Sequence, residues 1–125
     1  MVALREIMTP EVAAVSPEES VAKAAGVMIQ GRFGSVAVLV GATLVGILTE
    51  RDVLRAAAAG GDLSAEPVRE WMTEDPVTAA GGDDTEDASE TMLAGGFRHL
   101  PVVEGNDLVG IVSLRDLLSA RIRRS

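Results

Sequence analysis

Apolar and polar residues follow the same order twice along this chain. In each half a short apolar stretch leads to a polar turn, and a segment with apolar residues at helical spacing follows. Two mostly apolar stretches joined by a turn of hairpin length come next, and a second helical segment closes the half. The pattern predicts β-α-β-β-α in both halves. The expected elements are 12–15, 20–30, 36–40, 44–48 and a helix from Glu50, then 77–79, 85–94, 100–103, 108–112 and a helix from Leu114.

The two halves are a sequence repeat. An offset of 64 residues aligns residues 4–56 with 68–120 without a gap, and it gives far more identical pairs than composition alone would. We expect one unit at residues 1–59, a linker at 60–66 and a second unit at 67–125. Each unit is too small to bury its own sheet, and its strands are apolar at nearly every position. The sequence therefore predicts an α+β fold of two units packed sheet to sheet.

Glycine and proline mark some of the expected boundaries. Gly31 and Gly95 follow the first helix of each unit, where a left-handed residue is expected to end the helix. Pro67 is expected to open a short helix at residues 68–72.

Composition excludes several classes of protein. The net charge is −8 and only three residues are aromatic, so neither a basic surface nor a stacking platform for nucleic acid is expected. Without cysteine there is no disulfide and no thiolate metal site. Arg5 and Glu6 interrupt any signal-peptide pattern, and the longest apolar stretch, residues 36–48, is too short to cross a membrane. We expect a cytoplasmic protein with no membrane or nucleic-acid partner.

The candidate chemistry lies at residues 46–52 and 110–116. Each segment reads as a strand ending in glycine and two apolar residues, then a hydroxyl residue, two variable residues and an aspartate. A hydroxyl and backbone N–H groups at a helix start suit a phosphate, and the aspartate suits a ribose diol. The same spacing also forms a capping box, in which the hydroxyl and the acid only stabilise the helix. Both interpretations fit the residues.

No catalytic constellation is recognisable in the sequence. There is one histidine, no nucleophile paired with a base, and no cluster of metal ligands, so an enzyme is not expected. His99 is a candidate phosphate contact, although a lone histidine beside a buried strand more often has a structural role. The methionines of the two repeats fall at apolar positions and are expected in the core.

The whole pattern resembles the CBS domain, named after cystathionine β-synthase and usually found as a tandem pair, the Bateman module. The resemblance rests on Arg-Glu-Ile-Met-Thr-Pro at 5–10, Arg-Glu-Trp-Met-Thr at 69–73, Phe-Arg-His-Leu-Pro-Val-Val at 97–103 and the two Gly-x-x-Thr/Ser-x-x-Asp segments. It implies two repeats about a pseudo-twofold axis, with two clefts between them that hold AMP, ADP, ATP or, in some members, S-adenosylmethionine. No other cofactor is required.

Carried over by position, the resemblance implies a main and a second nucleotide-binding cleft. Arg98 and His99 of repeat 2 align with Gly34 and Ser35 of repeat 1, so the expected basic pair is present in repeat 2 alone. The cleft that contains Asp116 is therefore the main one. Its residues would be Thr9, Ala13, Phe33, Gly34, Arg98, Ile111, Ser113, Arg115 and Asp116, and those of the second cleft Ile47, Thr49, Arg51, Asp52, Thr73, Val77 and Phe97.

The expected function is that of a regulatory, signalling module. It would sense an adenosine nucleotide of the AMP, ADP or ATP class and act in trans on a protein target. Apolar residues on the second helix of each unit, Leu54 and Leu118 among them, indicate a homodimer. The alternative is a ligand-free dimerisation or scaffold module whose Thr/Ser-x-x-Asp motifs only cap helices.

Overall fold

The computed structural model describes residues 1–124, with side chains up to Ile122. Strands and helices alternate in the order expected from the sequence, so the α+β class is confirmed. The elements are η1 (Leu4–Glu6), β1 (Ala14–Val15), α1 (Val21–Gly31), β2 (Ser35–Val40), β3 (Thr43–Thr49), α2 (Glu50–Ala58), η2 (Val68–Glu70), β4 (Thr73–Glu74), β5 (Ala79–Ala80), α3 (Thr85–Gly95), β6 (His99–Glu104), β7 (Asp107–Ser113) and α4 (Leu114–Arg124).

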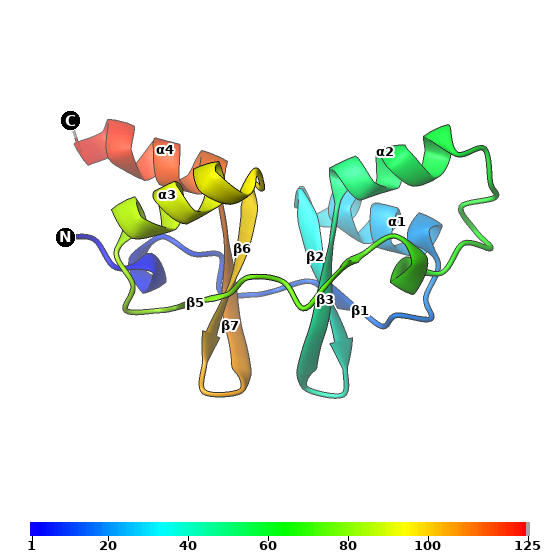
Figure 1. Ribbon diagram of the computed structural model, residues 1–125, viewed down its shortest axis with the longest axis horizontal. Coiled ribbons are helices and arrows are strands. Elements are labelled where there is room, and N and C mark those ends of the chain that lie inside the picture. Colours follow the sequence, from blue (N-terminus) through cyan, green and yellow to red (C-terminus); the bar gives the residue numbers. More distant parts are fainter. Residues whose placement is uncertain (125) are drawn as a thin grey trace. The chain divides into compact units, whose positions relative to one another are not determined.

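Each repeat is built around one antiparallel hairpin. In the first repeat β2 pairs with β3, β1 adds parallel to β2, and β4 adds antiparallel to β3. In the second, β6 pairs with β7 and β5 adds parallel to β6. Helices α1 and α2 lie together beside the β2–β3 hairpin, and α3 and α4 lie together beside the β6–β7 hairpin (Figure 1). The hairpin turns contain Gly41 and Gly105, both with positive φ, as hairpin turns of this length require.

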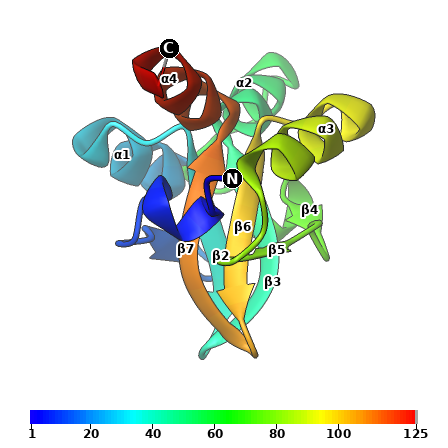
Figure 2. The same cartoon turned by 90° about the vertical axis from the view of Figure 1, so that its left-hand side faces the viewer.

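One compact unit combines residues Met1–Val12 with the chain from Val77 onward. The backbone of Thr9 pairs with that of Ile111 in β7 through two hydrogen bonds of 3.0 and 3.1 Å. Leu4 also donates its backbone N–H to the Asp83 carbonyl at 2.9 Å. The N-terminal segment, blue in Figure 2, lies beside β7. The opening of repeat 1 is therefore part of the unit that contains the hairpin of repeat 2.

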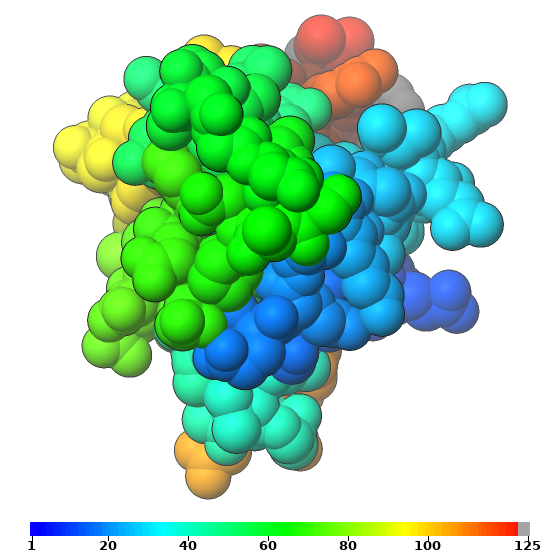
Figure 3. All heavy atoms as spheres, turned by 90° about the vertical axis from the view of Figure 1, so that its right-hand side faces the viewer, coloured from blue at the N-terminus to red at the C-terminus, as the bar shows by residue number. Residues whose placement is uncertain are grey.

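The other compact unit is Ala13–Pro76, and it contains the opening of repeat 2. The backbone N–H of Val68 donates to the Glu19 carbonyl, and that of Val21 to the Glu66 carbonyl, both at 2.8 Å. Figure 3 shows the stretch after α2, in green, against the start of α1 and the residues before it, in blue. The sequence repeats and the compact units thus differ, because the two repeats exchange their opening segments.

Each unit has its own aliphatic core. In the unit Ala13–Pro76 the core is formed mainly by β2, β3 and α1, and in the other unit by β6, β7 and α3. Met28 and Met92, at equivalent places in the repeats, are both buried, which confirms that these methionines are core residues. The buried residues are Val15, Ala24, Met28, Val36, Val38, Leu48 and Val68 in one core and Leu4, Ala88, Met92, Leu100, Val102, Val112 and Leu117 in the other.

The expected C-caps were placed one residue too early. Gly31 and Gly95 are the last helical residues, and the left-handed positions are Arg32 and Gly96, with φ of 59° and 72°. A different constraint explains the two glycines. A Cβ at Gly31 would collide with the ring of Phe33, which folds back over the helix end, and Gly95 has the same relation to Phe97. The glycines are needed for space, while the chain reverses at the next residue.

Other boundaries differ in smaller ways. The parallel strands are shorter than expected and begin later, at Ala14 and Ala79. Pro67 is the extended N-cap residue directly before a helix that begins at Val68 as expected, but that helix is a single 3₁₀ turn that ends at Glu70. Strand β4 was not expected, because two residues carry no detectable alternation.

Polar side chains cap and stabilise the N-terminus of α1. The Ser20 hydroxyl accepts the backbone N–H of Lys23 at 3.1 Å, as an N-cap serine does. The Glu19 carboxylate pairs with the Lys23 ammonium at 2.8 Å and accepts the backbone N–H of Ser16 at 2.8 Å. These contacts lower the pKa of Glu19, the Lys23 side chain contributing most. The sequence Ser16–Lys23 therefore sets where this helix begins.

Replacing Gly26 by alanine is expected to stabilise the protein. Gly26 is inside α1, and a Cβ there would meet nothing within 4 Å. Alanine lowers the conformational entropy of the unfolded chain, so the free energy of unfolding should rise by about 0.5–1 kcal/mol. Urea denaturation measures it. Gly31→Ala is the matched control and should destabilise through the Phe33 ring; a destabilised Gly26→Ala would contradict the account.

Candidate functional site

The candidate segment of repeat 2 joins the end of β7 to the start of α4. The Ser113 hydroxyl accepts the backbone N–H of Asp116 at 3.0 Å, and Oδ2 of Asp116 accepts the backbone N–H of Ser113 at 3.0 Å. These two bonds form a capping box, which was one of the two interpretations of the motif. They use only one oxygen of the half-buried Asp116 carboxylate. Among the side chains that the structure describes, up to Ile122, and the backbone of residues 1–124, no other donor bonds that carboxylate, so Oδ1 is available to a ligand.

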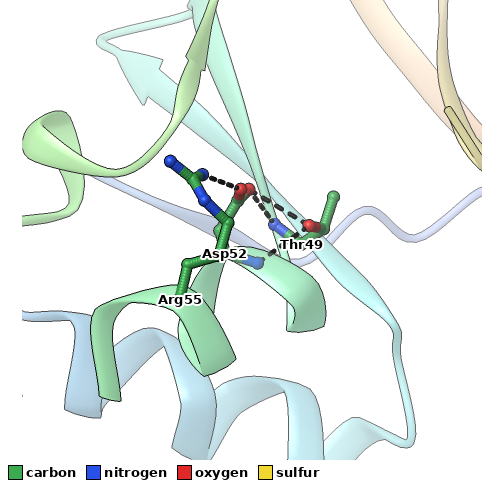
Figure 4. Close-up of polar contacts among 3 residues, drawn as sticks. All are labelled: Thr49, Asp52 and Arg55. Atoms are coloured by element: carbon green, nitrogen blue, oxygen red, sulfur yellow. Dashed lines mark hydrogen bonds and ion pairs between the residues drawn. The ribbon is translucent and has the colours of Figure 1, made fainter. Parts of the chain in front are cut away.

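The equivalent segment of repeat 1 joins β3 to α2 and contains the same box. Oδ2 of Asp52 accepts the backbone N–H of Thr49 at 2.9 Å and its hydroxyl at 3.1 Å, while the Thr49 hydroxyl accepts the Asp52 N–H at 3.3 Å. In addition, Nη1 of Arg55 donates to Oδ1 of Asp52 at 3.0 Å (Figure 4). Both oxygens of Asp52 are therefore engaged, and the residue is only 7% exposed.

The two aspartates thus differ although their motifs match. Position 119 of repeat 2 corresponds to Arg55 and is an exposed serine. Arg55 also lies over the Trp71 ring, with its guanidinium carbon 5.6 Å from the ring centroid. The position equivalent to Trp71 in the other repeat is Ile7, which has no aromatic ring. The sequence interpretation did not include Arg55 or Trp71. The mismatches Arg55/Ser119 and Trp71/Ile7 in the repeat alignment were the signal that could have identified them.

The glycine that opens each motif has a packing role. A Cβ on Gly110 would stand 2.5 Å from the sulfur of Met8, and one on Gly46 would stand 2.6 Å from the sulfur of Met72. The same Cβ atoms would also approach the backbone carbonyls of Thr9 and Thr73 to 3.0 and 2.9 Å. Each glycine lets the opening segment of a repeat approach the strand that leads to the motif.

Arg98 and His99 lie at the same edge of the unit as the Ser113 motif. The Arg98 carbonyl accepts the backbone N–H of Leu114, the first residue of α4, at 2.8 Å. His99 is the register partner of Ser113 across β6 and β7. Arg98 and Arg115 are exposed, and within the described residues no hydrogen bond or ion pair engages either guanidinium. Arg115 is therefore in the first turn of α4, and Arg98 and His99 are connected to the start of this helix through the backbone of β6 and β7.

The first repeat has the same backbone arrangement with different side chains. The Gly34 carbonyl accepts the N–H of Glu50 at 3.0 Å, and Ser35 is the register partner of Thr49. Ser35 is buried, so this edge has no counterpart of the Arg98 and His99 pair. The two helix starts therefore differ in charge, as the alignment of Arg98 and His99 with Gly34 and Ser35 predicts.

The residues expected in each cleft are divided between the two compact units. Thr9 pairs with Ile111 and Thr73 with Ile47, which places each threonine at the strand that leads to a motif. Of the main set, Thr9, Arg98, Ile111, Ser113, Arg115 and Asp116 belong to the unit from Met1–Val12 and Val77 onward, while Ala13, Phe33 and Gly34 belong to Ala13–Pro76. Of the second set, Ile47, Thr49, Arg51, Asp52 and Thr73 belong to Ala13–Pro76, and Val77 and Phe97 to the other unit.

The described part of the chain has neither a metal-binding cluster nor a membrane-spanning helix. Histidine, aspartate and glutamate side chains do not gather there in any group of three or more suited to a metal ion. Within residues 1–124, none of the helices has the length and apolar character needed to cross a membrane.

Comparisons with known proteins agree with the fold and its repeat. The "CBS domain-containing protein YhcV" of Bacillus subtilis is 41% identical over 94% of this chain and 84% of its own length. The structure of CBSX2 in complex with AMP superimposes with a TM-score of 0.87 at 24% identity and covers 98% of both chains. The CBS domain pair of MJ0100, bound to 5′-methylthioadenosine and S-adenosyl-L-methionine, gives a TM-score of 0.91 at 21% identity over 100% of this chain and 99% of the other.

The family assignment rests on both repeats. The model of the CBS domain matches residues 4–59 and again residues 68–123. These ranges agree with the two sequence repeats. The chain belongs to the CBS domain family and contains a tandem pair of its domains.

Proposed function

We propose that this chain is a non-catalytic regulatory module that binds an adenosine nucleotide of the AMP, ADP or ATP class. The nucleotide binds at Asp116, and the bound state is read by a protein partner in trans. Asp116 accepts the ribose hydroxyls, while Ser113 and the first N–H groups of α4 face the phosphate. Arg98 and Arg115 provide the charge that the phosphate requires.

The observation that carries this proposal is the unused oxygen of Asp116. The capping box occupies Oδ2 and leaves Oδ1 without a donor among the described residues. A half-buried carboxylate oxygen is a strong acceptor, and a ribose diol offers two donors to it. The unpaired guanidinium groups of Arg98 and Arg115 support the same proposal, since the net charge of −8 otherwise repels an anion.

The relatives support the chemical class of ligand. CBSX2 was crystallised with AMP, and the MJ0100 domain pair with 5′-methylthioadenosine and S-adenosyl-L-methionine. Adenosine is common to all three ligands. Phosphate is specific to AMP, and the arginines beside Ser113 favour the nucleotide over the uncharged thioether in this chain.

A second candidate function follows from the capping boxes. Both Asp52 and Asp116 form the reciprocal bonds that stabilise a helix start, so a helix-capping role would explain why both repeats have the motif, without a ligand. In that case the chain is a ligand-free dimerisation or scaffold module.

A thermal-shift experiment separates these functions. Ligand at about 100 times its Kd should stabilise the native state by about 2.7 kcal/mol, which raises the Tm by several degrees. We expect this shift with at least one of AMP, ADP, ATP and S-adenosylmethionine, and none with inorganic phosphate or CMP. If none of the adenosine compounds shifts the Tm at millimolar concentration, the scaffold function is the correct one.

We also propose a homodimer. Leu54 on α2 and Leu118 and Ile122 on α4 are exposed aliphatic side chains, and apolar helix faces of this kind are typical of subunit interfaces. Light scattering at micromolar concentration should give about twice the chain mass, and the double substitution Leu54→Glu, Leu118→Glu should shift it to the monomer. A wild-type mass near 13.0 kDa would contradict the dimer.

A further inference from the structure

The Asp52 motif is linked to a chain of polar contacts that has no equivalent at Asp116. Oε2 of Glu66 accepts the indole N–H of Trp71 at 3.2 Å, which orients the ring. The guanidinium of Arg55 lies over that ring at 5.6 Å, within the range of a cation–π contact, and bonds Oδ1 of Asp52 at 3.0 Å. Arg55 therefore contacts the Trp71 ring and also pairs with the Asp52 carboxylate; Figure 4 shows the second of these contacts.

This arrangement changes what Asp52 can offer to a ligand. A ribose diol needs carboxylate lone pairs, but Thr49 uses Oδ2 twice and Arg55 uses Oδ1. A charge-assisted bond to arginine is stronger than a bond to a neutral hydroxyl, so the sugar does not displace it readily. At Asp116 the corresponding position 119 is a serine, and Oδ1 has no donor within the described residues.

We propose that Arg55 closes the Asp52 motif to ribose, so that each chain takes up its adenosine nucleotide at Asp116 alone. Trp71 and Glu66 are positioning residues, because they hold Arg55 in place without touching the carboxylate. The inference rests on the function proposed above, and it adds the residue that decides which of two matching motifs is occupied.

Calorimetric titration with AMP tests this inference in the Asp116→Asn variant, in which the main site is weakened. Wild type should bind one AMP per chain, and Asp116→Asn should bind at least about tenfold more weakly. Adding Arg55→Ser should restore one site, with a Kd at least about tenfold tighter than that of Asp116→Asn alone. Arg69→Ser in the same background is the matched control. It removes an arginine of the same compact unit that pairs with Glu18 and not with Asp52, and it should restore nothing.

Introducing an arginine beside Asp116 tests whether such a residue closes that motif to ribose as well. Ser119 is the position of α4 equivalent to Arg55. Ser119→Arg in the otherwise wild-type chain should therefore weaken AMP binding at least about tenfold. Arg55→Gln keeps a long side chain over Trp71 but removes the charge, and it should behave as Arg55→Ser does. Thermal unfolding of each variant shows that the fold is retained, and the Gln variant provides the test if the Ser variant is unstable.

The outcomes separate this inference from the proposed function. If the wild type binds two AMP molecules equally, or if both Arg55 variants leave the Asp116→Asn background unchanged, Arg55 does not close the motif, and the proposed function still stands. If the wild type binds no adenosine compound, the proposed function itself is wrong.

Discussion

Replacing Asp116 by asparagine is expected to weaken AMP binding by about 1.5–3 kcal/mol, which is roughly tenfold or more in Kd. The asparagine oxygen can still accept the Ser113 N–H, so the helix start is retained. The charge that binds the ribose diol is lost, and the side-chain amide then presents donors where the ribose needs acceptors. Calorimetric titration measures the loss directly.

The matched control for Asp116 is Asp52→Asn. Because Arg55 and Thr49 already engage the Asp52 carboxylate, this substitution should leave the affinity for AMP within about twofold of wild type. Asp52→Asn should instead lower the free energy of unfolding, because it removes the ion pair with Arg55. If neither substitution changes the affinity while both variants stay folded, the ribose assignment is wrong and the motifs act only as caps.

Truncating Leu48 to alanine is expected to lower the free energy of unfolding by about 2–5 kcal/mol. Leu48 is near the end of β3, is fully buried, and packs in the core of the unit Ala13–Pro76. Its position one residue before Thr49 links this core directly to the candidate motif. The loss comes from buried methyl groups and from the cavity that remains, since a close-packed core relaxes only in part.

Urea denaturation measures the loss for Leu48→Ala, and Leu93→Ala is the control. Leu93 is an exposed leucine on α3, so its truncation should change the unfolding free energy by no more than about 0.5 kcal/mol. Equal losses at the two leucines would show that the core does not follow the burial described above.

The hydrophobic pattern was sufficient for the order of elements because both repeats obey it. Apolar spacing distinguishes the α1 and α3 helices from the hairpin strands, and Gly41 and Gly105 mark the hairpin turns. The pattern could not place the left-handed residues after α1 and α3. Gly31 and Gly95 looked like these residues, but the left-handed residues are Arg32 and Gly96, and the two glycines instead make room for the Phe33 and Phe97 rings.

The exchange of opening segments between the units was also beyond the sequence. Residues 4–9 and 68–73 are similar in sequence, and the local pattern does not indicate which sheet each segment joins. The pairing of Thr9 with Ile111 and of Thr73 with Ile47 decides it, and both are long-range contacts.

The candidate site could be predicted only as far as its motif extends. The Thr/Ser-x-x-Asp spacing gave the capping boxes, and the alignment of Arg98 with Gly34 gave the difference in charge. The engagement of Asp52 by Arg55 could not be derived from the motif, because it depends on Trp71 lying beneath the arginine. A tertiary contact therefore distinguishes two motifs that are nearly identical in sequence.

A crystal structure obtained with less than one AMP per chain tests directly whether the nucleotide binds at Asp116. We expect electron density for the nucleotide at Asp116, with the ribose on its carboxylate and the phosphate toward Ser113 and Arg98. Density only at Asp52 would contradict the order of the sites.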